Sequence, residues 1–585
     1  MFAVIKPKTL ILALMAVSLF AAQFAFTGCA DEESTALRMQ VYMQPNQAQE
    51  LCNDASVFRV GAFDMPMVGS PTKSIIWQAE FNASTFCNGG AITLDPVSTQ
   101  KQTVLVMEAL NKAGSPLASL TRDKETVLGR GITEPITWNA DELVEAKIVL
   151  GKVANFSLVK ASSIVKVPKA LQSMTTTTLP DHRVLILGGV GIRNNAKIYY
   201  DDAYIYDPGT MTTITLPENA GYRANHTATL LSDGSVLIVG GEKRGTSADV
   251  PTGTNTEVYL FKPNSMTFQK LGDLAGRTSH IAVRTQKSTG EEVVLIAGGL
   301  SYDTGSPRVL NDAYVYNHST GQIAPTLSPM NKARADFDGV ALNDGRVVVQ
   351  GGVGSYLDTG FAISQASLEI YDPNTDSWTL KEFSEQENKS ELSRYGHKLL
   401  HIEATTDSGY HEQIGIVGGV TSYEALRTDY SKTIYMFDTN GDWISQDCQP
   451  SITGGGRKWF TLSEYSVDEK QVFMMAGGAY SEAVDTSRSL VLRSDGVIFS
   501  FKYDETAQNF CGFDRTRSYG YVAGAGTDAA LSGLPLAVPR YLHAASNIGN
   551  GQILIVGGNI GSAITDTMEV FIEPTENNAT VFTAY

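Results

Sequence analysis

The sequence predicts an all-β protein in which a small β-sandwich precedes a seven-bladed β-propeller, and three observations support this prediction. First, an apolar strand that ends in a Gly pair occurs seven times, from VLILGG at Gly188 to ILIVGG at Gly557. Second, the first glycines of successive copies are 52, 58, 53, 67, 59 and 80 residues apart, and a period of about 50 residues is typical of propellers with four-stranded blades. Third, residues 38–160 lack this period but contain short strand-like runs between Gly, Pro and Asn breaks, which are typical of a sandwich.

Residues 1–28 are predicted to be an export signal. They combine a basic start, an apolar run and small residues at the end, and the run is too short and too early for a permanent spanning helix. The ending Thr27, Gly28, Cys29 resembles a bacterial lipobox, which implies that Cys29 becomes the lipidated first residue of the mature chain. Lipid carbons buried at about 0.8 kcal/mol per CH₂ would hold the protein on a membrane. Ala30 follows in place of an Asp that would imply inner-membrane retention, so we expect the outer membrane, with residues 29–37 as a tether. A plain secretory signal is the alternative.

The cysteine count fits export. Removal of Cys29 from the five cysteines leaves Cys52, Cys87, Cys448 and Cys511, which form two pairs that lie far apart in the sequence. In an oxidising compartment we expect the disulfides Cys52–Cys87 and Cys448–Cys511. The sequence does not prove this connectivity, and free buried thiols are the alternative.

Residues 38–160 contain the strand-like runs RMQVYM, SVFRVGAF, SIIWQAEF, TVLVMEAL and AKIVLGKV. Their alternation and breaks predict a small β-sandwich domain. The order of Cys52, a strand, Cys87 and then TVLVMEALNKAGSPLAS resembles immunoglobulin-like or carboxypeptidase-regulatory-like modules of exported bacterial proteins. The resemblance implies a spacer between the membrane and the rest of the chain.

Each Gly pair has companions in a fixed order. A strand and a tight turn precede the pair, as in HTATLLSDGSVLIVGG, where Asp-Gly favours a hairpin. A variable stretch and a third strand follow, and this strand ends in an aromatic turn such as AYIYDP near Tyr206; the sixth copy instead reads SLVLRSDGVIFSFK. These residues resemble the kelch repeat, and the resemblance covers about residues 165–585. It implies a kelch-type β-propeller over residues 161–585.

The variable stretches after the Gly pairs mark the side of the propeller that we expect to bind a ligand. If the four strands of a blade are antiparallel neighbours, these stretches and the connections between blades lie at the same end, and variable loops on a rigid scaffold commonly carry binding sites. At that end a basic residue recurs in six copies, with Leu171 in the corresponding place of the first. The candidate ligand-binding residues are Arg223, Arg277, Arg334, Arg394, Arg457 and Arg540.

A ring of guanidinium groups would suit carboxylate, sulfate or phosphate groups. The structural alternative is that each arginine bonds loop carbonyls or a neighbouring acid to join adjacent blades, because repeated positions commonly serve repeated structural needs. His226, His280, His397 and His543 recur three residues after their arginines, and the same alternative has them bonded to local groups.

The composition excludes few functions. The net charge of −17 argues against general nucleic-acid binding, which needs a basic face. We found no set of residues that predicts catalysis, a metal or a cofactor. We therefore expect a monomeric, non-enzymatic, lipid-anchored envelope protein that binds a protein or glycan, with an anionic ligand as one possibility. The alternatives are a sialidase-like or epimerase-like propeller enzyme that acts on acidic sugars, and a purely structural envelope component.

Overall fold

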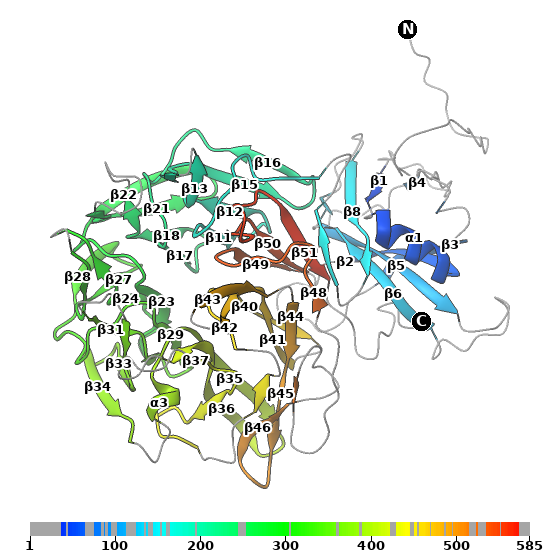
Figure 1. The fold of residues 1–585 in the computed structure, drawn as a ribbon. Helices are drawn as coiled ribbons and strands as arrows, with labels where there is room; N and C mark the ends of the chain where they lie inside the picture. The colour runs from blue at the N-terminus through cyan, green and yellow to red at the C-terminus, as the bar shows by residue number, and fades with distance from the viewer. Residues whose placement is uncertain are drawn as a thin grey trace. The chain divides into compact units, whose positions relative to one another are not determined.

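The computed structural model describes most of the chain from residue 37 onward. The described residues are 37–42, 45–64, 75–82, 87, 92–94, 102–112, 125–133, 136–137, 144–152, 155–159, 164–193, 196–243, 253–303, 306–357, 362–384, 389–421, 429–444, 450–452, 456–467, 470–484, 487–493, 495–513, 522–523, 534–549 and 552–572. Their regular structure is nearly all β-strand, arranged in many small and mainly antiparallel sheets (Figure 1). The prediction of an all-β protein is confirmed. Within these residues no helix has the length and apolar character that crossing a membrane requires.

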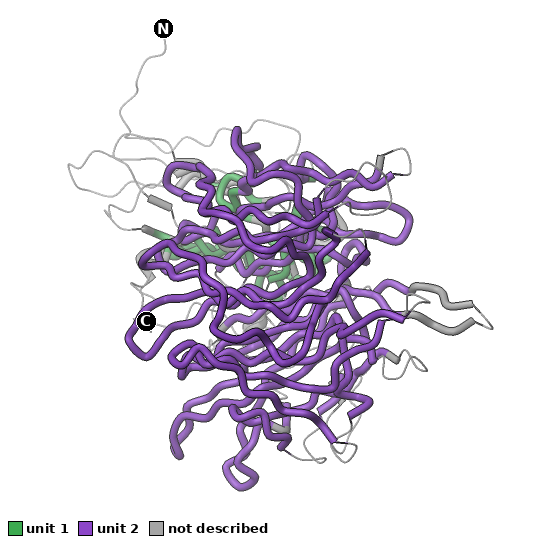
Figure 2. The backbone as a smooth tube through the Cα atoms, turned by 90° about the vertical axis from the view of Figure 1, so that its left-hand side faces the viewer, with its two compact units in different colours: residues 1–165, 207–212, 570–585 green, residues 166–206, 213–569 purple. Residues whose placement is uncertain are grey.

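The chain divides into two compact units (Figure 2). Unit 1 contains residues 1–165, 207–212 and 570–585, and unit 2 contains residues 166–206 and 213–569. Each unit has its own buried apolar residues, and we describe each by itself.

Unit 1 has two sheets and one helix. One sheet has the order β4-β1-β8 and the other the order β3-β2-β5-β6-β9, with β7 beside β5. The strands are β1 (Leu37–Tyr42), β2 (Val57–Asp64), β3 (Ile75–Asn82), β4 (Ile92–Leu94), β5 (Gln102–Lys112), β6 (Glu125–Ile132), β7 (Ile136–Thr137), β8 (Val144–Val149) and β9 (Gly151–Lys152); β10 is Asn155–Leu158.

The two sheets of unit 1 share one apolar core. Met39 and Ile148 of the first sheet pack in the same cluster as Phe58 and Met107 of the second. Helix α1 (Pro45–Asp54), which the sequence analysis did not predict, adds the buried Leu51 to this cluster.

The first predicted disulfide is confirmed. Cys52 of α1 is bonded to Cys87, and their Cα atoms are 5.8 Å apart. Cys448 lies outside the described residues, and so does the side chain of Cys511. The predicted signal, Cys29 and the predicted tether up to residue 36 also lie outside them, whereas Leu37 begins β1.

Unit 2 repeats one small antiparallel sheet. In each of the first four sheets the strands are hydrogen-bonded in chain order, except that a short hairpin interrupts the chain between the second and third strands. These sheets are β11 (Thr175–Thr178), β12 (Val184–Leu187), β15 (Ala203–Asp207) and β16 (Thr212–Thr215); β17 (Thr227–Leu230), β18 (Val236–Val239), β21 (Glu257–Lys262) and β22 (Thr267–Asp273); β23 (Ile281–Gln286), β24 (Glu292–Ala297), β27 (Ala313–Asn317) and β28 (Gln322–Pro325); and β29 (Asp338–Ala341), β30 (Val347–Gln350), β33 (Ser367–Asp372) and β34 (Ser377–Glu382).

The last three sheets of unit 2 vary this pattern. The fifth has two long strands with two short ones beside the second, the sixth takes its fourth strand from far along the chain, and the seventh contributes three strands. They are β35 (Arg394–Thr406), β36 (Gly409–Thr421), β37 (Asp429–Tyr430) and β38 (Tyr435–Phe437); β40 (Thr461–Val467), β41 (Lys470–Ala476), β44 (Asp495–Phe499) and β48 (Leu534–Pro535); and β49 (Ala544–Gly549), β50 (Gln552–Val556) and β51 (Met568–Ile572).

Successive sheets of unit 2 are neighbours, and the last is a neighbour of the first. The first strands β11, β17, β23, β29 and β35 lie side by side in that order (Figure 1), while β40 lies beside β49 and β49 lies beside β11. The second strands are deeply buried: Val236–Val239 of β18 and Val347–Gln350 of β30 are buried at every position. A strand buried on both faces explains the continuous apolar runs before the Gly pairs.

The Gly pairs connect each sheet to the next. The second Gly donates its backbone N–H to the carbonyl oxygen of the arginine, or of Leu171, that begins the following sheet. The seven bonds join Gly189 to Arg223, Gly241 to Arg277, Gly299 to Arg334, Gly352 to Arg394, Gly419 to Arg457, Gly478 to Arg540 and Gly558 to Leu171, at 2.6–2.9 Å. The last bond joins the end of the repeat to its beginning.

The first Gly of each pair must be glycine for two reasons. Its φ lies between 58° and 67° in all seven copies, a region that other residues rarely adopt. In six copies a Cβ atom would also lie only 2.4–2.5 Å from the carbonyl oxygen of the next sheet's arginine or of Leu171. The Gly pair therefore permits the close approach of adjacent sheets.

The stretches after the Gly pairs are short hairpins. In five sheets the described part of the stretch forms a two-stranded ribbon. These ribbons are β13 (Val190–Arg193) with β14 (Ala196–Tyr199), β19 (Glu242–Lys243) with β20 (Gly253–Thr254), β25 (Leu300–Ser301) with β26 (Arg308–Val309), β31 (Val353–Tyr356) with β32 (Ala362–Ser364), and β42 (Ala479–Val484) with β43 (Ser487–Leu492). We call the end of the sheets that carries them the hairpin side.

Candidate functional site

The six predicted arginines are among the most buried side chains of the protein. Each guanidinium is 0% exposed, and each Nη1 donates to the carbonyl oxygen of the first Gly in its own sheet, at 2.7–3.2 Å. Each arginine therefore bonds its own Gly pair through its side chain and the preceding Gly pair through its backbone carbonyl.

Acidic side chains neutralise some of these arginines, and aromatic rings cover others. Arg334 pairs with Glu369 at 3.1 Å and Arg540 with Glu569 at 2.5 Å, with all four side chains fully buried. Arg277 and Arg457 pair with Asp312 and Asp495, at 2.7 and 2.9 Å. Arg223 lies over the ring of Tyr259 and Arg394 over that of Tyr435, at 5.5 and 5.0 Å from the centroids.

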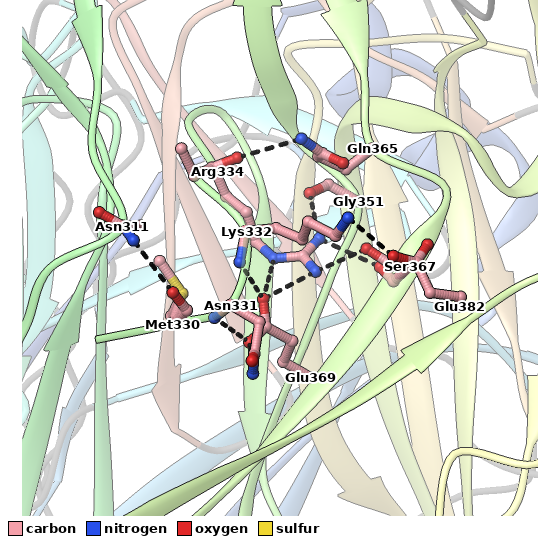
Figure 3. A network of polar contacts seen from close by, with 11 residues as sticks. Asn311, Met330, Asn331, Lys332, Arg334, Gly351, Gln365, Ser367, Glu369 and Glu382 are labelled. Atoms are coloured by element: carbon pink, nitrogen blue, oxygen red, sulfur yellow. Dashed lines mark hydrogen bonds and ion pairs between the residues drawn. The ribbon is translucent and has the colours of Figure 1, made fainter. Parts of the chain in front are cut away.

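Figure 3 shows the network around Arg334. Its Nη1 donates to the carbonyl oxygens of Gly351 and Ser367, and its Nη2 donates to Ser367 Oγ and Glu369 Oε1. Glu369 also accepts hydrogen bonds from the backbone N–H groups of Asn331 and Lys332. The Glu369 carboxylate thus links the loop that precedes Arg334 to β33, the third strand of the same sheet.

This geometry corrects the expectation of an anion site. A guanidinium that is fully buried and bonded to carbonyl oxygens and carboxylates cannot also bind an external anion. Arg223, Arg277, Arg334, Arg394, Arg457 and Arg540 are structural residues here, as in the alternative stated above. The recurring histidines act similarly: Nε2 of His226, His280 and His543 lies 2.8–3.0 Å from a Thr hydroxyl of the neighbouring sheet.

The residue two places after each arginine, or after Leu171, has an unusual backbone. Ser173, Asn225, Ser279, Asp336, Gly396, Trp459 and Leu542 all have φ between 51° and 62°. We call these seven residues the belt, because backbone hydrogen bonds of 2.9–3.3 Å connect them from sheet to sheet. Leu542 donates to Trp459, Ser173 to Leu542, Asn225 to Ser173, Ser279 to Asn225, Asp336 to Ser279 and Gly396 to Asp336.

Aromatic side chains gather beside the belt on the hairpin side. We call Tyr302, Tyr356, Tyr395, Trp459 and Tyr541 the aromatic rim; they come from the third to the seventh sheets in order. Trp459 stacks on Tyr541 with ring centroids 5.5 Å apart. Tyr356 is 38% exposed and the other four are half-buried. Burial, with smaller contributions from the neighbouring Tyr302, Asp336 and Tyr395, raises the pKa of Tyr356 to about 12.

Two opposite charges lie within this rim. The ammonium of Lys458 is 3.8 Å from the centroid of the Trp459 ring and 5.7 Å from that of Tyr395. Burial lowers the pKa of Lys458, although Asp336 opposes the shift. Burial likewise raises the pKa of Asp336 against the effect of Lys458 and Lys398. Because both groups are half-buried, their charges are only partly solvated yet remain accessible.

The aromatic rim was not predicted from the sequence, although one signal was present. Tyr395, Lys458 and Tyr541 each directly follow a recurring arginine, and Trp459 follows Lys458. The corresponding residues of the second, third and fourth sheets are the small Ala224, Thr278 and Ala335. An alignment of the repeat on its arginines would have revealed this change from small to aromatic residues.

The comparisons with known proteins give no family. No protein-family model matches the chain, and the search of curated proteins found no match. No cluster of His, Cys, Asp or Glu suited to a metal ion occurs among the residues described. A solved structure entitled "Structure of YjhT" is similar to this chain with a TM-score of 0.36 and 12% identity, covering 69% of this chain and 96% of its own. So distant a likeness carries no argument about function.

Proposed function

We propose that unit 2 is a seven-bladed, kelch-type β-propeller that binds a protein or glycan partner through its hairpin side. In this proposal residues 1–28 are removed, and Cys29 is lipidated and anchors the protein in the outer membrane. The cyclic series of Gly-to-arginine bonds supports the propeller, because the bond from Gly558 to Leu171 closes the series after seven sheets. A closed ring of sheets leaves no long open edge and so provides a rigid base for binding residues.

The aromatic rim is the observation that carries the binding role. Aromatic side chains that are half-buried or exposed have a large apolar surface and a polar tip, and they dominate many interfaces. Here they come from five sheets and meet at the end that also carries the hairpins. Side chains that served only to pack a core would be fully buried, as Tyr204 and Tyr371 are at 1% exposure.

Burial of the six arginines removes the reason for considering an enzyme that acts on acidic sugars. An arginine triad for a carboxylate needs accessible guanidiniums, and these six are 0% exposed. A purely structural envelope component is the outcome that the experiment must distinguish from a binding protein.

The experiment compares partner capture by matched tyrosine variants. The full chain in mild detergent is immobilised and exposed to envelope extract of the producing cell, and captured proteins and glycans are identified. Tyr356→Ala is compared with Tyr410→Ala, because Tyr410 is 49% exposed but lies beside the turn that joins β35 to β36, at the opposite end of its sheet. We expect the first variant to lose the partner and the second to retain it. Equal capture by both variants, or no partner for the wild type, would refute the proposal.

A further inference from the structure

We infer that Trp459, Tyr395 and Asp336 form a binding site for a cationic group, an amine or quaternary ammonium, which Lys458 of the same chain occupies as an internal competitor. The inference rests on the proposed function, because it assigns a ligand class to the aromatic rim. The proposed ligand carries a positive charge, whereas the recurring arginines suggested a negatively charged one.

The rings already bind a cation. A positive charge within about 6 Å of an aromatic centroid is attracted to the negative face of the ring, and Lys458 Nζ meets this condition for both Trp459 and Tyr395. No hydrogen bond or ion pair joins this ammonium to any other residue in the described part of the chain. The Lys458 ammonium is therefore held by the rings and by the more distant charge of Asp336, without a hydrogen bond or ion pair among the described residues, so another cation can replace it.

The carboxylate of Asp336 is suitably placed and unpaired. No described residue donates a hydrogen bond to it, and its neighbour Lys398 forms an ion pair with Asp338 instead, at 3.3 Å. Its Oδ2 lies 3.6 Å from the place where a Cβ of Gly396 would be, so the glycine leaves this side of the carboxylate uncovered. An incoming cation can contact both the rings and the carboxylate, which Lys458 does not do.

The backbone fixes the position of Trp459. Its φ of 57° is unusual for a bulky residue, and such a conformation persists only where the surrounding structure enforces it. The carbonyl oxygen of Trp459 accepts a belt hydrogen bond from Leu542 at 3.2 Å. The aromatic platform is thus preformed, which lowers the entropic cost of binding.

An anion suits the site less well. It would gain the charge of Lys458 but would meet the unpaired Asp336 carboxylate and the negative faces of the rings. The net charge of −17 also favours the approach of cations over anions.

Calorimetry of the full chain in mild detergent tests the inference, with tetramethylammonium as the probe and sodium at the same ionic strength as the reference. Lys458→Met keeps most of the side chain but removes the competing charge, so we expect at least fivefold tighter binding than in the wild type. Asp336→Asn and Trp459→Gly should weaken binding at least tenfold, and glycine tolerates the positive φ at position 459.

The matched control is Lys169→Met. Lys169 also lies over an aromatic ring, that of Tyr200 at 4.5 Å, and forms an ion pair with Asp202; this change should leave tetramethylammonium binding unaltered. The inference is overturned if the folded Lys458→Met protein binds the probe no more tightly than the wild type, or if acetate binds the wild type and Lys458→Met abolishes that binding. If either of these results is obtained but Tyr356→Ala still abolishes capture of the partner, the proposed function stands and only the ligand class is wrong.

Discussion

The substitution Arg334→Ala removes the positive member of a fully buried ion pair. Arg334 and Glu369 are both 0% exposed, and the guanidinium also bonds two carbonyl oxygens and the Ser367 hydroxyl. Loss of one partner leaves an uncompensated buried charge, which costs about 3–5 kcal/mol. Urea denaturation monitored by circular dichroism should show unit 2 destabilised by this amount.

Arg223→Ala is the internal control for this prediction. Arg223 bonds the corresponding Gly240 carbonyl at 3.2 Å but lies over Tyr259 with no ion-pair partner among the described residues. Its loss leaves unpaired carbonyls only, so we expect a smaller cost of about 1–3 kcal/mol. The double variant Arg334→Met with Glu369→Gln removes both charges and should be more stable than Arg334→Met alone. Equal losses for Arg223→Ala and Arg334→Ala, or no recovery in the double variant, would refute the reasoning.

Three further predictions concern other features of the chain. Gly240→Ala should destabilise unit 2 by about 1–3 kcal/mol in urea titrations, because residue 240 has a left-handed backbone and the new Cβ would lie 2.4 Å from the Arg277 carbonyl oxygen. Gly272 has open space around it, so Gly272→Ala should not destabilise the unit. Nε2 of His401 lies 2.5 Å from Oε1 of Glu412; burial lowers the pKa of His401, but its hydrogen bond to Glu412 and the charges of Glu412, Glu403 and Glu464 together raise the net pKa above 6.5. The stability that wild type has over His401→Gln should therefore be fully present below pH 6.5 and lost as the pH rises through the raised pKa; a difference that grows with pH would contradict this. Replacement of Cys52 and Cys87 by alanine opens a loop with a sequence separation of 35 residues, which should destabilise unit 1 by roughly 4 kcal/mol through loop entropy. The measurement is the shift of the urea midpoint of unit 1, and reduction of the disulfide in the wild type should give the same shift.

The repeat was predictable because its physical requirements are local. Each Gly pair needs a positive φ and each second strand needs apolar residues on both faces, so both appear directly in the sequence. The roles of the arginines depend on distant residues. Glu369 and Glu569 neutralise Arg334 and Arg540 from mainly apolar third strands, and only the fold brings these acids to the arginines. An acid within LEIYDP or MEVFIEP was the one local sign of this pairing.

The aromatic rim was harder to predict for a related reason. Its members occupy different positions in different copies: Tyr395 and Tyr541 directly follow an arginine and Trp459 lies two residues after one, whereas Tyr356 ends the hairpin strand β31. They share no single sequence pattern, because the arrangement of separate sheets brings together residues from two different positions of the repeat. Helix α1 was missed because its apolar face is short and six of its ten residues are polar or charged.

The most direct test of the central claim, that the hairpin side is the binding surface, is site-specific photo-crosslinking in the producing cell. A benzophenone amino acid is placed at position 356 on the hairpin side or at position 410 at the opposite end, both of which are exposed in the structure. We predict one dominant adduct with a partner from position 356 and none from position 410. The same adduct from both positions, or an adduct from position 410 alone, would contradict the claim.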